Sequence, residues 1–242
     1  MKVREINENP AWTFVLPDSI ADWDAPSHWE RERLASMQHH LKPGMTLYDV
    51  GTEHGWLSAV YGSFTGHEYM VLIEPSAEMW NNVRKTWVAN DLRSPIACFQ
   101  MFCGATPSSK TAPRVASWPE CSDMFAEADE CPAMAYKYLG AEGIQVTTID
   151  QIAAATKQPP QAITIDVEGF ELDVVKGAEK TLKRHHPLVW ISVHPDLMAR
   201  DAGVPDVQEL FDFMTACGYG REYLGTDHEQ HHFFAPFGYV AP

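Results

Sequence analysis

The sequence predicts an α/β fold in which helices cover both faces of a mostly parallel sheet. Between residues 46 and 103, short apolar runs alternate with amphipathic helical segments in the order β-α-β-α-β. Strands separated by helices in this way run parallel. A later run, Leu188–Val193, is apolar almost throughout, as expected of a strand that is buried on both faces.

The first half of the chain supplies the regular part of this pattern. Long side chains recur every fourth residue from Trp29 to Leu41, and Pro43 follows, so a helix is expected over 28–41. Residues 1–27 show no clear periodicity and are expected to be an N-terminal arm with a short strand around 12–16. The next expected elements are strands at 46–50, 69–73 and 96–103 and helices at 56–64 and 78–90.

Residues 104–143 interrupt the alternation with four prolines and a single helix candidate, 121–139. Such a long insertion favours a lid or an acceptor-binding segment within one domain over 28–242.

Three histidines of the terminal hairpin are interpreted as surface or packing residues: His228, His231 and His232. Beyond the insertion we expect strands at 145–149, 163–166 and 188–193, helices at 150–155, 171–182 and 206–217, and a hairpin of 221–224 with 231–235.

Composition limits the possible partners. The formal net charge is −15 and no cluster of Lys and Arg is present, which argues against binding to nucleic acid. No apolar run is long enough to span a bilayer, and the N-terminus does not resemble a signal peptide. The five cysteines form no C-x-x-C pair and indicate reduced thiols in a cytoplasmic protein. Cys121 and Cys131 leave a zinc pair as a weak alternative.

The strongest chemical motif is the loop from Asp49 to Gly55, with Glu74 at the end of the next expected strand. Its glycines allow a ligand to approach the backbone, and Glu74 can accept hydrogen bonds from ribose hydroxyls. The loop lacks the G-x-G-x-x-G pattern and is acidic, so it is unsuited to pyrophosphate, and a nicotinamide oxidoreductase is disfavoured. S-adenosylmethionine fits better. The residues expected to bind it are Asp49, Gly51, Thr52, Glu53, Gly55 and Glu74.

A second group of side chains follows two later strands. Asp166 and Glu168 end one strand, where burial of a carboxylate requires a donor, a cation or a ligand. Glu171 is interpreted as an acidic residue in the first turn of a helix. His194 ends the neighbouring strand and could act as a general base, or could bind a divalent metal with Asp166 and Asp196. A histidine that only bonds a loop carbonyl remains an alternative.

With these motifs placed, the sequence resembles the FkbM family of methyltransferases. Residues 49–55 are similar to the family's D-[VI]-G-A-N-x-G loop, residues 73–75 to its F-E-P element, and residues 165–178 to its I-D-[VI]-E-G block. Thr52 and Glu53 depart from the usual Ala-Asn, and many relatives have a glutamate after the strand that here ends in His194. The resemblance covers about 28–235.

The resemblance implies a Rossmann-like class I methyltransferase with seven strands, the last antiparallel, and O-methylation of sugars or natural-product hydroxyls. The leading hypothesis is methyl transfer from S-adenosylmethionine to a small-molecule or carbohydrate acceptor, with Asp166, Glu168 and His194 as catalytic residues. Two alternatives remain open: a divalent-metal-dependent O-methyltransferase, and a non-catalytic binding or assembly subunit.

Overall fold

The computed structural model describes residues 1–21, 29–110, 113, 115, 118 and 145–242. Its centre is a seven-stranded sheet with the order β10-β11-β9-β8-β3-β4-β5. Neighbouring strands from β9 to β5 are parallel, whereas β11 is antiparallel to both β9 and β10. The expected seven-stranded sheet with an antiparallel last strand is therefore confirmed. The strands are β3 (Leu47–Val50), β4 (Met70–Ile73), β5 (Ala97–Phe99), β8 (Ala162–Ile165), β9 (Leu188–Val193), β10 (Tyr219–Thr226) and β11 (Gln230–Pro236).

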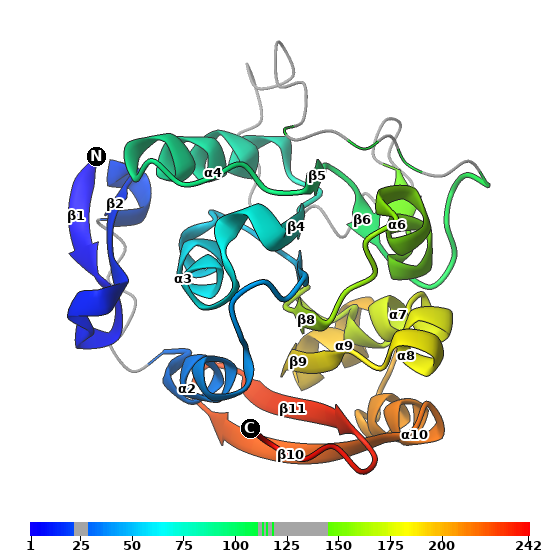
Figure 1. Cartoon of the computed structure of the whole chain (residues 1–242). Helices are drawn as coiled ribbons and strands as arrows, with labels where there is room; N and C mark the ends of the chain where they lie inside the picture. Colours follow the sequence, from blue (N-terminus) through cyan, green and yellow to red (C-terminus); the bar gives the residue numbers. More distant parts are fainter. Residues whose placement is uncertain (22–28, 111–112, 114, 116–117, 119–144) are drawn as a thin grey trace.

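Helices cover both faces of this sheet, in two hydrophobic layers. Figure 1 shows α2 and α3 on one side of the sheet and α6, α7, α8 and α10 on the other. The first layer contains α2 (Arg31–His40), α3 (Trp56–Thr65) and α4 (Ala77–Ala89). The second contains α6 (Ile149–Thr156), α7 (Glu171–Lys176), α8 (Glu179–His185), α9 (Pro195–Asp201) and α10 (Gln208–Ala216).

The side chains of the inner strand β3 pack into both hydrophobic layers. Leu47 belongs to the first layer and Tyr48 to the second, because successive side chains of a strand point to opposite faces. All four residues of β3 are buried, so it has no solvent face. The Tyr48 hydroxyl reaches the far edge of its layer and donates a 2.8 Å hydrogen bond to the carbonyl of Gln158.

The N-terminal residues form a hairpin of β1 (Lys2–Glu5) and β2 (Thr13–Leu16) that packs on α4. The side chain of Asn90, directly after α4, forms two hydrogen bonds with the backbone of β2. The Val15 amide donates to Asn90 Oδ1 (2.7 Å), and Asn90 Nδ2 donates to the Val15 carbonyl (2.8 Å). Trp12 and Phe14 are buried in the first layer. Short helical turns complete this region and the start of β4: α1 (Asp18–Ala21) and the 3-10 turns η1 (Ile6–Glu8), η2 (Pro10–Trp12) and η3 (His67–Tyr69).

Two expected elements are divided in the structure. The expected strand 96–103 separates into β5 and β6 (Phe102–Cys103), and β6 pairs with β7 (Val146–Thr147) in a sheet of its own. The expected helix 171–182 breaks between α7 and α8 at Gly177, where a Cβ would lie 2.0 Å from the Gly104 carbonyl oxygen. The chain at Gly177 thus packs closely against the segment after β6, which has left the main sheet to pair with β7. The helix α9 was not expected.

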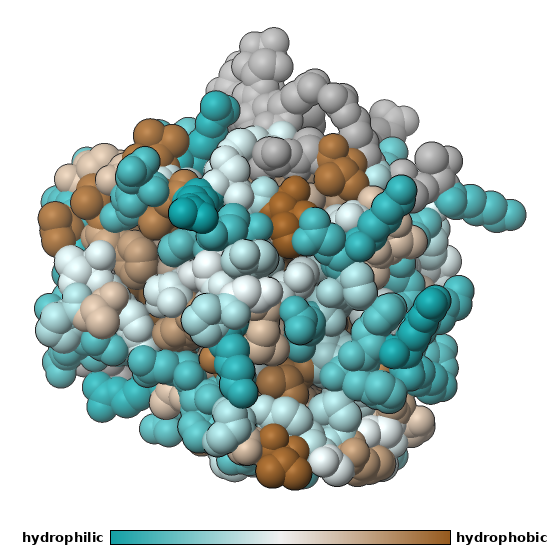
Figure 2. All heavy atoms as spheres, viewed as in Figure 1, coloured by the Kyte–Doolittle hydropathy of each residue, from teal (hydrophilic) through white to brown (hydrophobic). Residues whose placement is uncertain are grey.

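Hydrophilic residues cover much of the face shown in Figure 2, with hydrophobic residues in small groups between them. Such scattered groups are normal on a globular protein. Among the described residues, no helix is long and apolar enough to cross a membrane. Residues 22–28 of the expected arm, the helix candidate 121–139, Cys121 and Cys131 lie outside the described part of the chain.

Candidate active site

A cavity of about 550 Å³ lies at the carboxyl ends of the parallel strands, bounded by the segments that follow β3, β4, β5 and β8 and by the hairpin turn before β11. Ligands bind at this edge in open α/β sheets. The basic side chains in its wall are Arg33 and His228. Eight carboxylates also line it: Glu30, Asp49, Glu53, Glu74, Asp166, Glu168, Asp173 and Glu229.

The loop after β3 requires its first glycine for packing. Gly51 has a φ of +91°, and a Cβ there would lie 1.7 Å from the Asp166 carbonyl oxygen. The loop after β3 therefore passes directly against the chain after β8. Gly55 also has a positive φ, but it packs against Val83 of α4 and is absent from the cavity wall. Of the cofactor residues expected from the sequence, Gly55 thus has a structural role in this geometry.

Asp49 is held rigidly at the base of the cavity. Ser58 Oγ donates a hydrogen bond to Asp49 Oδ2, and the Asp49 side chain is nearly inaccessible to solvent. Burial raises the pKa of Asp49 to about 6, although the Ser58 hydroxyl and the Arg33 charge oppose the shift. The Thr52 hydroxyl donates a 3.3 Å hydrogen bond to the Asp49 carbonyl.

Glu74 follows β4 and faces the same cavity. Its two oxygens accept backbone hydrogen bonds from Glu53 (3.0 Å) and Ser76 (2.7 Å), which fixes the plane of the carboxylate. Each oxygen keeps a further lone pair for a ligand. Burial raises the pKa of Glu74 to about 7 against these two hydrogen bonds. Glu53 itself adopts a positive φ of 49°.

Asp166 and Glu168 occupy the wall of the cavity that follows β8. The Asp166 Oδ2 atom lies 3.3 Å from both terminal nitrogens of Arg33, a buried residue of α2. Burial and then Glu229 raise the pKa of Asp166 to about 7, while Arg33 and His194 oppose the shift. Glu168 has a φ of +55°, and about half of its side chain is exposed (49%). A left-handed backbone at a non-glycine residue stores strain and is common at functional sites.

His194 is held between carboxylates. Its Nδ1 lies 2.7 Å from Glu171 Oε1, and its Nε2 contacts Glu229 Oε2. Burial lowers the pKa of His194, but the hydrogen bond to Glu171, the contact with Glu229 and the charge of Asp166 outweigh it and raise the pKa to about 12. A protonated imidazole cannot take a proton from an acceptor. The assignment of His194 as a general base stays a prediction, since it requires the neutral imidazole, which these contacts disfavour.

The structure also changes the interpretation of Glu171 and Asp196 that the sequence suggested. Glu171 is fully buried, and its Oε1 accepts the Gly169 amide (2.9 Å) besides contacting His194, so it is more than an acidic residue of a first helical turn. Asp196 is exposed at the start of α9 and is not part of the cluster around His194. The described cysteines Cys98, Cys103 and Cys217 are free thiols.

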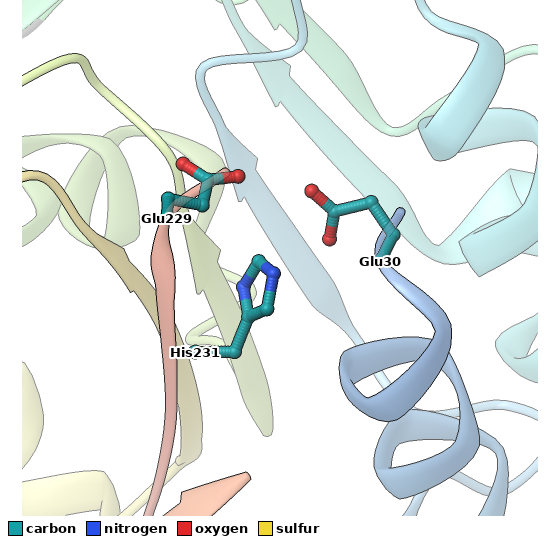
Figure 3. Close-up of side chains that lie close together, drawn as sticks. All are labelled: Glu30, Glu229 and His231. Atoms are coloured by element: carbon teal, nitrogen blue, oxygen red, sulfur yellow. The ribbon is translucent and has the colours of Figure 1, made fainter. Parts of the chain in front are cut away.

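Sequence reasoning missed a third part of the site. Arg33, Glu30 and Glu229 are all buried, and Glu30 Oε2 lies 2.5 Å from Arg33 Nε. Figure 3 shows Glu30, next to the start of α2, and Glu229, next to the start of β11, facing each other above the ring of His231. His228 and His231, interpreted as surface or packing residues, flank Glu229; His228 borders the cavity. The one signal in the sequence was Arg33, a charged residue among the apolar residues that recur every fourth position from Trp29 to Leu41.

The fold and the acidic cavity define a Rossmann-like methyltransferase of class I. Residues 49–220 match the sequence profile of the methyltransferase FkbM domain, so the chain belongs to the FkbM methyltransferase family. This confirms the expected family, and S-adenosylmethionine is the cofactor of this class. No curated protein sequence matches the chain.

Solved structures resemble the chain in fold. A precorrin-6y C5,15-methyltransferase from Geobacter metallireducens GS-15 has 10% identity and a TM-score of 0.51, over 92% of this chain and 94% of that one. A methyltransferase FkbM from Methylobacillus flagellatus KT has 16% identity and a TM-score of 0.48, over 83% of this chain. The match spans half the length (50%) of the Methylobacillus protein. An S-adenosylmethionine-dependent methyltransferase from Aquifex aeolicus has 16% identity and a TM-score of 0.48, over 90% of this chain and 97% of that one.

Proposed function

We propose that this chain binds S-adenosylmethionine in the cavity and O-methylates a hydroxyl of a small molecule or carbohydrate. The observation that carries the proposal is that one cavity joins two chemically different walls. One wall presents Glu74, with free lone pairs on both oxygens, and the other presents Asp166 and Glu168. A cofactor on the first wall would place its reactive end toward the second.

The first wall suits an uncharged nucleoside with a cationic end. Glu74 is positioned to accept hydrogen bonds from the two ribose hydroxyls. Ile73, Pro75 and Phe102 give an apolar surface for a purine ring. Burial and the neighbouring carboxylates raise the pKa of Glu53 to about 8, and a ligand that carries ammonium and sulfonium charges would favour its ionised form. A cavity of about 550 Å³ is within the range of ordinary ligand sites.

The second wall would bind the acceptor. When bound, the cofactor would supply a methyl group on a positively charged sulfur, and transfer to the acceptor oxygen would break the carbon–sulfur bond. Asp166, fixed by Arg33, would orient the acceptor hydroxyl. Glu168, which is half-exposed, would take the hydroxyl proton. His194 would act as a positioning residue for the carboxylates around it.

The charge of the cavity supports a neutral or cationic acceptor. Its eight carboxylates far outnumber its basic side chains, and the whole chain carries a net charge of −15. A polyanion such as nucleic acid would be repelled from such a surface. We therefore propose a small or carbohydrate acceptor without phosphate groups.

Cofactor binding is tested by calorimetry with S-adenosylmethionine. We expect micromolar to submicromolar binding, and no heat at millimolar ligand would overturn the proposal. Transfer is then measured with methyl-labelled cofactor over a panel of sugars, alcohols, phenols and amines. Label on nitrogen instead of oxygen would reject O-methylation, and cofactor binding with no transfer to any acceptor would favour a binding subunit.

The role of Glu168 is tested with Glu168→Gln. We expect turnover to fall by about 10²–10⁴-fold with cofactor affinity unchanged, because the variant removes only the proton acceptor. Glu179→Gln, which removes an exposed carboxylate on α8, is the matched control. Full turnover in Glu168→Gln would exclude Glu168 as the base.

A further inference from the structure

We propose that Asp166, His194 and Glu229 bind a divalent cation beside the acceptor wall. Each offers one ligand atom, and the three atoms lie within 4.8 Å of one another. They come from three separate segments, after β8, after β9 and before β11, which meet at this edge of the sheet. Only the role of the ion rests on the proposed function; its binding is a separate claim.

The surroundings of His194 are those of a metal ligand. Metal-bound histidines usually donate their second ring N–H to a carboxylate, which fixes the ring and its tautomer. Here Glu171, fully buried on α7, occupies that position at 2.7 Å from His194 Nδ1. The opposite nitrogen, Nε2, faces Glu229 and lies 3.8 Å from both Asp166 Oδ1 and Glu168 Oε2. One imidazole nitrogen is thus directed at three carboxylates.

Glu229 provides the second observation. Its side chain is 2% exposed, yet its Oε2 atom, on the side of His194, has no hydrogen bond within the part of the chain that the structure describes. Its contact with His194 Nε2 is close but lacks hydrogen-bond geometry. A buried carboxylate oxygen without a donor is costly. A cation between Glu229, His194 and Asp166 would take the place of the proton on His194 Nε2, which leaves to solvent, and would satisfy all three ligand atoms.

The alternative group in Figure 3 is less suitable. Glu30, Glu229 and His231 also lie close enough to hold an ion. However, both ring nitrogens of His231 already have partners, Ser192 Oγ at 3.2 Å and Asp227 Oδ1 at 3.0 Å. Glu30 Oε2 lies 2.5 Å from Arg33 Nε. Both His231 nitrogens are thus occupied, whereas His194 Nε2 is directed at carboxylates, so the His194 group is favoured.

The ligand set indicates the kind of ion and its role. One imidazole with two or three carboxylates suits a first-row divalent cation such as Mn²⁺, whereas Mg²⁺ and Ca²⁺ prefer oxygen ligands throughout. Glu168 lies next to the group, and Glu229 borders the cavity. On the proposed function, the ion would bind the acceptor oxygen and hold it against the cofactor.

The test is a titration of the full chain with Mn²⁺, without cofactor, followed by electron paramagnetic resonance. We expect one bound ion per chain, and binding weakened at least about tenfold in Glu229→Gln and in Glu171→Gln, which loses the carboxylate behind His194. Asp196→Asn is the matched control, because it removes an exposed carboxylate two residues from His194. Its affinity should equal that of the wild type.

A spectroscopic measurement on the wild-type protein tests the proposal even if a variant fails to fold. Electron spin echo modulation of bound Mn²⁺ should show nitrogen coupling from one imidazole, and the coupling should be lost in His194→Gln. Absence of binding at millimolar Mn²⁺, bound Mn²⁺ without nitrogen coupling, or unchanged affinity in folded Glu229→Gln would each overturn the proposal. Since no cofactor is present, failure of this titration is distinguishable from failure of S-adenosylmethionine binding.

Discussion

The guanidinium of Arg33 places both of its terminal nitrogens 3.3 Å from the same oxygen of Asp166, although the two residues lie 133 positions apart in the chain. Arg33 is 1% exposed and also bonds to Ser192 and Glu30. It therefore joins α2 to the ends of β8 and β9 and compensates part of the negative charge of the site. A buried ion network of this kind is strongly weakened when one member is removed.

We expect Arg33→Met to lower the free energy of unfolding by about 3–5 kcal/mol, because it leaves buried carboxylates without their cation. Urea unfolding followed by circular dichroism measures the change. Arg200→Met is the control: Arg200 forms an exposed pair with Asp201, and its loss should leave the unfolding midpoint unchanged. Equal midpoints for the two variants would show that the Arg33 network does not stabilise the fold.

Substitutions at Gly51 and Gly44 can test whether the chain segments after β3 and β8 approach each other closely. Both have a φ near +90°, but a Cβ meets the Asp166 carbonyl at Gly51 and meets nothing within 4 Å at Gly44. Gly44→Ala should cost about 1–2 kcal/mol of stability from backbone conformation alone. Gly51→Ala should cost about 1–3 kcal/mol more, because the two loops must separate. Thermal unfolding compares them, and equal melting temperatures would contradict the close approach.

Glu74→Gln should weaken binding of S-adenosylmethionine by about 10–100-fold, since hydrogen bonds to a charged acceptor contribute about 1.5–3 kcal/mol. The cause is the loss of the ionised acceptor for the ribose hydroxyls. Calorimetry measures the affinity, with Glu78→Gln on the exposed side of α4 as the control. If both variants bind like the wild type, the ribose lies elsewhere in the cavity.

Cofactor affinity should rise with pH through about 7. The free protein holds the Glu74 carboxyl protonated below its pKa of about 7, and the ribose hydroxyls require the ionised form. Binding therefore lowers the pKa and releases a proton near neutral pH. We expect affinity at pH 6 to be about tenfold below that at pH 8, because one pKa unit corresponds to a tenfold change. Calorimetry in buffers of different ionisation enthalpy counts the proton, and Glu74→Gln should flatten this dependence. Affinity that falls as pH rises would contradict the assignment.

Local patterns predicted most of the sheet. The apolar runs of β3, β4, β8 and β9 were identified within about one residue, because periodicity and length are properties of each segment alone. The breaks at Gly177 and after β5 could not be predicted, since each depends on a contact with a distant segment. The same limit applied to His194: its position beside Asp166 was expected, whereas its contacts with Glu171 and Glu229 were not.

The sequence by itself determined which residues stand at the carboxyl ends of the strands: Asp49, Glu74, Asp166, Glu168 and His194. These follow from strand boundaries, which local side-chain patterns encode. Only the tertiary structure brought Arg33 and Glu229 to them, by packing α2 and the turn before β11 against that edge. Glu229 favours the charged form of His194, and Arg33 offsets part of the negative charge of the acceptor wall. Such pairings depend on which distant segments meet, and no periodicity within a segment specifies that.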